Sequence, residues 1–309
     1  MRWAILGAGG VGSYFGGRLA AAGQDVTLVA RGEHLAALRR DGLRMEDPDG
    51  RVEIFPIRAT GDTVEVGQVD VVLLGVKTWQ LAGALPALRP LISAGTVVVT
   101  AQNGVEAPEE VAATVGRDAV VPGMVKIFAN LDGPGRVRHV GGPASLTFGE
   151  WDGGSSQRVA TIRAELADAG ITAIATDDVW MQLWSKFLFV VPFGGLGTLL
   201  DLPIGELRAG PRTRRLLADC MQEIQGVAAA EGVRLPSDVV PATLAFIDQQ
   251  PADGISSLHR DNQAGRPSEL EAWTGAVVRR GARTGVATPL HDLVYEALGQ
   301  RAARLAHAP

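Results

Sequence analysis

The chain has 309 residues, of which 46% are hydrophobic and 20% are charged, and its formal net charge is −5 at pH 7. This composition excludes an intrinsically disordered protein and leaves room for two domains of ordinary size. The negative net charge gives no general attraction to nucleic acid or to an anionic membrane, so we expect neither as a partner. A single cysteine, Cys220, excludes an intrachain disulfide framework and predicts a buried thiol in a cytoplasmic protein.

A glycine-rich motif follows the first predicted strand, residues 4–6, and leads into a helical pattern. Strand, G-x-G-x-x-G and helix in this order are the dinucleotide-binding fingerprint of a Rossmann domain. Gly7 would permit the tight turn, Gly9 the approach of a pyrophosphate, and Gly12 the close packing of helix and strand. The alternative is a glycine-rich turn without a ligand. The predicted nucleotide-binding residues are Gly7, Gly9, Gly10, Val11 and Gly12.

Up to residue 178, strand and helix patterns alternate as in a doubly wound parallel sheet. The predicted strands are residues 4–6, 25–30, 69–76, 96–100, 119–125 and 172–175. The predicted helices between them are residues 35–41, 81–91, 105–115 and 157–169. Residues 136–150 contain glycines between short strand-like runs, which predicts a hairpin or meander at the edge of that sheet.

After residue 178 only helical patterns remain. They cover residues 179–200, 213–231, 237–249, 268–285 and 290–306. The most hydrophobic stretch, residues 187–200, is too short to span a bilayer and predicts a buried helix that Pro192 kinks. The predicted architecture is therefore an α/β Rossmann domain (residues 1–178) followed by an all-helical domain (residues 179–309).

The end of the second strand carries a cation instead of the expected acid. NAD-preferring Rossmann domains usually have Asp or Glu there to bind the ribose 2′-hydroxyl, whereas here the residue is Arg31. A guanidinium binds a 2′-phosphate, so Arg31 favours NADP over NAD, with a solvated arginine as the alternative. Lys77 directly follows the third strand and is a second candidate cation, unless it is an ordinary surface lysine.

The fourth strand ends in Gln102-Asn103-Gly104. The amide of Asn103 is well placed to bind a ribose or substrate oxygen, although Asn-Gly is also ordinary turn chemistry.

Together these motifs resemble the ketopantoate reductase (2-dehydropantoate 2-reductase) family, within the 6-phosphogluconate-dehydrogenase-like NADP reductases. The resemblance extends to Trp184-Ser185-Lys186, Ser256-Ser257-Leu258 and Ser268-Glu269-Leu270-Glu271, which occur in the family's order. It implies an NADPH-dependent enzyme that reduces a small 2-oxo acid to a 2-hydroxy acid, in family terms ketopantoate to pantoate for pantothenate biosynthesis.

The resemblance also implies roles for single residues. Arg31 and Lys77 would hold the 2′-phosphate, and Asn103 would position substrate near the nicotinamide ribose. Lys186 would be the general acid, Ser257 would bind the substrate carboxylate, and Glu269 would orient the substrate and tune the lysine.

The residues themselves leave alternatives open. Lys186 could be the polar edge of an amphipathic helix. Glu269 could have no role beyond a favourable interaction with the dipole of a helix that it opens, and Glu271 could be the site carboxylate instead. Ser256 or Ser257 could cap a helix rather than bind substrate.

The chain departs from the family pattern on one helical face. The family usually carries asparagines four and eight residues after the lysine, and here those substrate-facing positions are Val190 and Gly194. Because the site loses two hydrogen-bonding amides, we expect a less polar substrate than ketopantoate.

Two other functions fit the same motifs: a C=N reductase of the opine or imine type, and a non-catalytic NADP-binding sensor. The histidines show no metal-ligand spacing, so we expect no metal site. His259 lies near Ser257 and is expected on a helix surface, with a position lining the pocket as the alternative. Trp273, Val277 and Val278 could form the face of a homodimer or belong to the core. The five histidines are His34, His139, His259, His291 and His307.

Overall fold

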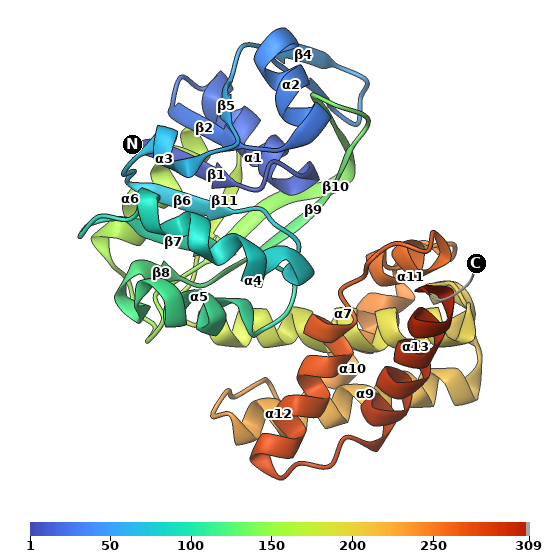
Figure 1. Ribbon diagram of the computed structural model, residues 1–309. Helices are drawn as coiled ribbons and strands as arrows, with labels where there is room; N and C mark the ends of the chain where they lie inside the picture. The colour runs from blue at the N-terminus through green and yellow to red at the C-terminus, as the bar shows by residue number, and fades with distance from the viewer. Residues whose placement is uncertain (307–309) are drawn as a thin grey trace. The chain divides into compact units, whose positions relative to one another are not determined.

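The computed structural model describes residues 1–306, and the chain divides into two compact units (Figure 1). The sheet unit comprises Met1–Gln102 and Ala107–Val179, and the helical unit comprises Asn103–Glu106 and the chain from Trp180 onward. The four residues Asn103–Glu106 thus lie within the first half of the sequence but group with the helical unit. His307 and the last two residues of the predicted helical domain lie outside the described residues.

The sheet unit is built on a parallel sheet of six strands, as the α/β prediction requires. Its order, β5-β2-β1-β6-β7-β8, reverses direction between β1 and β6, which is the doubly wound arrangement. All neighbouring pairs are parallel, and the central strands are apolar and buried on both faces. The strands are β1 (Arg2–Leu6), β2 (Asp25–Val29), β5 (Arg58–Thr60), β6 (Val71–Leu74), β7 (Val97–Thr100) and β8 (Val120–Val121).

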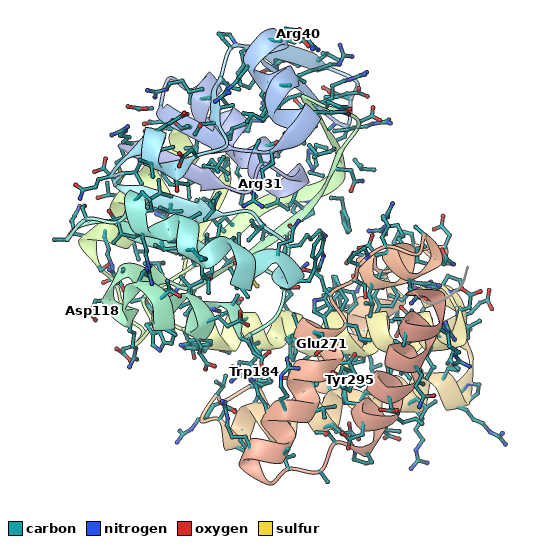
Figure 2. The ribbon with its side chains drawn as sticks, in the orientation of Figure 1. Arg31, Arg40, Asp118, Trp184, Glu271 and Tyr295 are labelled. Carbon is teal, nitrogen blue, oxygen red and sulfur yellow. The ribbon has the colours of Figure 1, made fainter. Side chains whose placement is uncertain are left out.

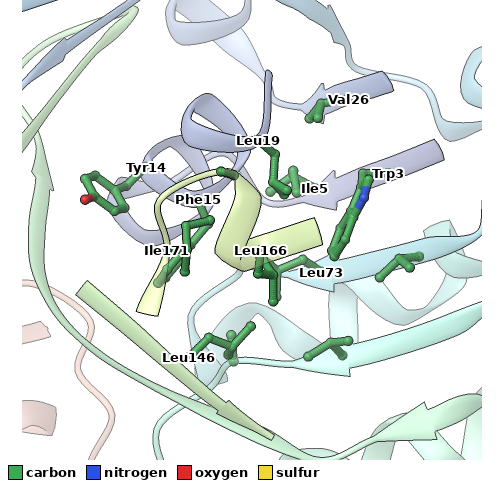
Figure 3. Packing of buried hydrophobic residues seen from close by; sticks show 14 of the residues in the cluster. Trp3, Ile5, Tyr14, Phe15, Leu19, Val26, Leu73, Leu146, Leu166 and Ile171 are labelled. Atoms are coloured by element: carbon green, nitrogen blue, oxygen red, sulfur yellow. The ribbon is translucent and has the colours of Figure 1, made fainter. Parts of the chain in front are cut away.

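Alternating side chains of β1 enter two separate hydrophobic clusters. Trp3 and Ile5 lie in one cluster with residues of α1, α2 and α6, part of which Figure 3 shows. Ala4 and Leu6 lie in the other cluster, with residues of α3, α4 and α5. The helices are α1 (Gly10–Ala21), α2 (Gly32–Asp41), α3 (Thr63–Val66), α4 (Leu81–Ala84), α5 (Ala107–Val115) and α6 (Gln157–Asp168), with 3-10 turns at Thr78–Gln80, Leu85–Leu91 and Arg117–Ala119.

The predicted hairpin at the edge of the parallel sheet is wrong in its location, because these residues belong to a second sheet. Its order is β11-β10-β3-β4, and β9 pairs antiparallel with β10. The glycines at 141 and 142 do not separate short strands; they accompany register shifts within β10, which bulges and continues. The strands are β3 (Leu43–Glu46), β4 (Val52–Phe55), β9 (Gly123–Leu131), β10 (Arg136–Phe148) and β11 (Thr172–Ala175).

The described residues of the helical unit form helices and no strands. α9 contacts α8, α10, α12 and α13, so it is the packing centre of the unit. The short helix α8 was not predicted from the sequence, whereas α11 is the helix that Ser256 or Ser257 was expected to cap. The helices are α7 (Val179–Leu200), α8 (Ile204–Ala209), α9 (Pro211–Ala230), α10 (Val239–Asp248), α11 (Ser257–Gln263), a π-helical turn (Glu271–Gly275), α12 (Ala276–Thr284) and α13 (Pro289–Ala306).

Helix α7 is long and apolar enough, by length and composition, to cross a membrane. However, 61% of its most apolar window is buried inside the structure, and Leu183, Trp184 and Leu188 are core residues. α7 is therefore best described as the core helix of its unit. It continues through Pro192 as one element.

Gly12→Ala is expected to destabilise the sheet unit. A Cβ at position 12 would lie 2.1 Å from the backbone oxygen of Gly7, so the helix and the glycine loop would have to separate. We expect a loss of about 1–3 kcal/mol in the free energy of unfolding, measured by urea denaturation. Gly83→Ala is the control, because a Cβ at this position in α4 meets nothing within 4 Å. Equal stability of the two variants would contradict the packing argument.

Candidate functional site

The glycine loop lies where the order of the parallel sheet reverses. The backbone N–H groups of Gly7 and Ala8 donate to the carbonyl of Val29 at the end of β2 (3.3 and 3.1 Å). The N–H of Gly75, after β6, donates to the carbonyl of Leu6 (2.9 Å). Gly7 has φ +102°, a conformation open to glycine but costly for other residues. The loop is thus fixed at the carboxyl ends of β1, β2 and β6, where nucleotides bind in open α/β sheets.

The glycines of this loop serve different purposes. At Gly7 a Cβ would lie 2.5 Å from the Val76 side chain, and at Gly10 it would lie 2.3 Å from the Ala129 carbonyl oxygen. These positions need glycine because the chain itself packs against them. At Gly9 the nearest protein atom would be 3.8 Å away, so the protein leaves that space open. The open space beside the N-terminus of α1 fits the approach of a pyrophosphate.

Two cations beside this loop have uncommitted side chains. Arg31 directly precedes α2, and Lys77 lies three residues after β6 (Figure 2 labels Arg31). Both side chains are exposed, and neither forms a hydrogen bond or ion pair with another described residue. They are therefore available for a phosphate group, as the predicted 2′-phosphate contact requires.

His34 contacts the residues next to the glycine loop, a role that the sequence pattern did not indicate. The N–H of Gly135 donates to His34 Nδ1 (3.0 Å), and His34 Nε2 lies 3.4 Å from the Ser13 hydroxyl oxygen. Burial lowers the pKa of His34 below its usual value, although a hydrogen bond to the Ala8 backbone opposes this change. A neutral imidazole therefore links α2 to the loop and to the start of β10.

In the helical unit, one amide joins the two predicted catalytic side chains. Lys186 Nζ donates to Asn103 Oδ1 (2.7 Å), and Asn103 Nδ2 donates to Glu269 Oε2 (3.1 Å). Glu269 is only 4% exposed, and Lys186 is half-buried on α7. The structure thus brings together a cation, an amide and a carboxylate from three separate parts of the sequence.

Asn103 is held in this position by contacts of the segment that follows it. A Cβ at Gly104 would lie 2.9 Å from the Ala272 carbonyl oxygen, so the segment fits closely against the π-helical turn. The buried guanidinium of Arg280 lies 3.8 Å from a Glu106 carboxylate oxygen and donates to the Val105 carbonyl (3.5 Å). The neighbouring Gln102 has a different role, because its amide donates to the carbonyls of Leu74 and Val76.

The choice between Glu269 and Glu271 is decided by their surroundings. Glu271 is exposed and binds Tyr295 (2.7 Å) and Arg279 (3.2 Å); Glu271 and Tyr295 are labelled in Figure 2. Glu269 faces Asn103 and precedes the π-helical turn, so it does not open an α-helix as expected. The carboxylate that binds Asn103 is therefore Glu269, which lies two residues before the π-helical turn.

The two neighbouring serines also differ. The Ser256 hydroxyl accepts a hydrogen bond from the His259 backbone N–H (3.0 Å) and caps α11. Ser257 is half-buried, and its hydroxyl has no hydrogen bond with another described residue, so it is available to a ligand. The expectation of a surface position for His259 is wrong, since its ring is buried and Nε2 lies 2.8 Å from Asp201 Oδ1.

Positions 190 and 194 follow Lys186 along the same face of α7. Val190 is half-buried, and Gly194 is buried. A Cβ at Gly194 would lie 2.6 Å from Cζ3 of Trp273, so the indole occupies the space of a side chain at this position. Trp273 and Val277 are buried in the core, and Val278 is half-buried, which removes the first two from any dimer face.

Within residues 1–306 no group of three or more His, Cys, Asp and Glu side chains is arranged to hold a metal ion. Cys220 is buried, as predicted, and burial raises the pKa of its thiol to about 12, with the nearby carboxylates of Glu223 and Asp219 acting in the same direction. It is therefore no nucleophile.

A Rossmann-type unit and a helical unit that holds a lysine, an amide and a carboxylate define an oxidoreductase that uses a nicotinamide nucleotide. Residues 3–153 match the family profile described as ketopantoate reductase PanE/ApbA, and residues 178–302 match its C-terminal counterpart. The chain belongs to this family, and it is an NAD(P)-dependent oxidoreductase.

Individual relatives are similar to this chain over nearly its full length. A 2-dehydropantoate 2-reductase from Mesorhizobium japonicum is 32% identical, and the match covers 95% of each chain. A PanE/ApbA family ketopantoate reductase from Ralstonia eutropha has a TM-score of 0.91 at 32% identity, covering 99% of this chain and 100% of the other. A D-mandelate dehydrogenase, solved with NADH and anilino(oxo)acetate, has a TM-score of 0.89 at 27% identity, with 99% and 100% covered.

Cys220 should resist thiol reagents in the folded protein. With a pKa near 12 instead of 9, the thiolate population at pH 8 falls about a thousandfold, and labelling should slow accordingly. Because folding favours the neutral thiol, this contribution to stability is complete below about pH 9 and is lost as the pH rises towards 12. Labelling with Ellman's reagent, with the urea-unfolded protein as control, measures the difference. Equal rates in both states would contradict the assignment.

Proposed function

We propose that the protein reduces a 2-oxo acid to a 2-hydroxy acid with NADPH as the hydride source. The observation that carries this proposal is the Lys186–Asn103–Glu269 hydrogen-bond chain, which holds an ammonium donor on a largely apolar helix. Its relatives support the reaction class: they include 2-dehydropantoate 2-reductases and a D-mandelate dehydrogenase, which are named for 2-oxo and 2-hydroxy acids.

The chain's residues supply proton transfer and orientation. When bound, the reduced nicotinamide nucleotide supplies the hydride that attacks the carbonyl carbon. Negative charge then develops on the carbonyl oxygen, and Lys186 stabilises it and donates a proton from Nζ. Asn103 fixes the direction of that ammonium group, because its amide oxygen accepts one of the three N–H bonds.

The remaining polar groups orient the substrate. The uncommitted hydroxyl of Ser257 would donate to the substrate carboxylate. Glu269 would accept a hydrogen bond from a substrate hydroxyl or from the lysine, while Asn103 holds it in place. These are the roles that the family motifs imply.

The preference for NADPH over NADH rests on Arg31 and Lys77. Both side chains are exposed cations beside the glycine loop and are free to pair with a 2′-phosphate. No acidic side chain takes the place of Arg31 at the end of β2 to bind a 2′-hydroxyl. The D-mandelate dehydrogenase of the same fold was solved with NADH, so the fold alone does not specify the nucleotide.

The substrate is proposed to be less polar than ketopantoate. Val190 and Gly194 offer no hydrogen-bonding side chain on the face of α7 that carries Lys186, and Trp273 fills the space at 194. A site that lacks groups to bind a hydroxyl gains no selectivity for a hydroxyl-bearing substrate. The buried single thiol fits a reducing compartment, and we propose the cytoplasm.

Lys186→Met should remove most of the turnover while the protein remains folded. Loss of a positioned general acid typically lowers the rate by about 10²–10⁴-fold, and we expect kcat to fall within this range. NADPH oxidation followed at 340 nm across a panel of 2-oxo acids measures it. Lys126→Met, at an exposed lysine of β9, is the matched control. Turnover that is unchanged in Lys186→Met would refute the role of Lys186.

Arg31→Ala should weaken the binding of NADPH more than the binding of NADH. Loss of a charge-assisted contact to the 2′-phosphate should raise the KM for NADPH by roughly 10–100-fold, whereas NADH, which lacks this phosphate, should change much less. Arg163→Ala, at an exposed arginine of α6, controls for net charge. If the KM values for both nucleotides rise equally, Arg31 does not bind the 2′-phosphate.

A further inference from the structure

We propose that Phe189, Phe193 and Phe246 form a subsite for an aromatic substituent on the 2-oxo acid. This inference rests on the proposed function, since it names the substrate class for the site at Lys186. The preferred substrates would be 2-oxo acids with an aryl group close to the carbonyl.

The first observation is the position of two rings relative to Lys186. Phe189 and Phe193 lie three and seven residues after the lysine, so helical geometry places all three side chains on one face of α7. The two rings are stacked, with centroids 5.7 Å apart and an interplanar angle of 14°. The helix face that presents the proton donor therefore continues as an aromatic wall.

The second observation is the third ring, which comes from another helix. Phe246 of α10 meets Phe189 edge to face, with centroids 5.1 Å apart and an interplanar angle of 90°. Phe246 is 47% exposed, whereas Phe193 is 9% exposed. The cluster thus begins in the core and ends in solvent, and its half-exposed rings have faces and edges that can bind another aromatic ring.

The third observation is that the two positions one and two turns after Lys186 on the same face carry no polar side chain. Val190 is apolar, and the indole of Trp273 fills the space beside Gly194. The nearest hydroxyl at this position belongs to Ser256, 3.5 Å from where a Cβ of residue 194 would lie, and it is already used as a helix cap. A substituent that extends from the carbonyl along α7 would therefore meet aromatic and aliphatic carbon.

These observations assign different parts of the substrate to different residues of the site. Lys186, Asn103 and Glu269 handle the carbonyl, while the three phenylalanines select the group attached to it. An aryl substituent would gain ring contacts and leave no buried polar group unpaired, whereas a hydroxyl-bearing alkyl chain would lose its hydrogen bonds to water.

The test compares two substrates in the wild type and in Phe246→Ala. With NADPH in excess, initial rates are measured for phenylglyoxylate, which carries an aryl group, and for 2-oxobutyrate, which carries a short alkyl chain. Wild-type kcat/KM should favour phenylglyoxylate, and Phe246→Ala should reduce that preference by about tenfold or more, mainly through KM. Phe246→Leu should keep part of it. Leu293→Ala, at an exposed leucine of α13, is the matched control and should retain wild-type values.

The outcomes separate this inference from the proposed function. Equal losses for both substrates in Phe246→Ala, or a wild type that prefers 2-oxobutyrate, would overturn the aromatic subsite and leave the reductase function standing. If no 2-oxo acid is reduced, the proposed function fails. In that case calorimetric titration with mandelate decides the subsite separately: binding that Phe246→Ala weakens would support it, and binding that is absent or unaffected would overturn it.

Discussion

The helical unit depends on one neutral amide between two charged groups. Asn103 accepts a hydrogen bond from the ammonium of Lys186 through Oδ1 and donates one to the carboxylate of Glu269 through Nδ2. Because the oxygen can only accept and the NH₂ group can only donate, the orientation of the amide is fixed. Charged side chains in an apolar interior are costly unless they are paired and hydrogen-bonded. The amide gives each of the two groups a hydrogen-bond partner. The lysine is therefore held as a directed hydrogen-bond donor on a helix that also contributes core residues such as Trp184 and Leu188.

The architecture could be predicted from the sequence because its signals are local. Apolar runs such as Val71–Leu74 and the glycine motif each specify an element by their own spacing, and a parallel sheet follows from their alternation with helices. The second sheet could not be predicted in this way. Its longest strand, β10, contains Gly141 and Gly142, which have the pattern of turn residues but lie in bulges where β9 shifts register. Only the register of pairing with β9, which the glycine pattern does not reveal, distinguishes a bulge from a turn.

The candidate site shows the same limit. Lys186 and Glu269 were identifiable from family motifs, but the sequence could not decide between Glu269 and Glu271. That choice depends on a π-helical turn that directs Glu269 towards Asn103 and leaves Glu271 to Arg279 and Tyr295. The packing of Trp273 on Gly194 was equally unpredictable, because the two residues are 79 positions apart and neither alone signals a contact. The role of His34 could not be predicted from the sequence either, because it depends on a hydrogen bond from the backbone N–H of residue 135.

The grouping of Asn103–Glu106 with the helical unit has a consequence for how this family can be divided and recombined. The amide that orients the lysine is encoded between β7 and α5, within the nucleotide-binding half of the sequence. A chimaera joined near residue 178 would combine the amide and its anchoring loop from one parent with the lysine, the glutamate and Arg280 from the other. The Lys186–Asn103–Glu269 hydrogen-bond chain is therefore encoded in both halves of the sequence, and its parts must stay compatible with each other. A gene fusion that respects only the apparent domain border would separate parts of one hydrogen-bond chain.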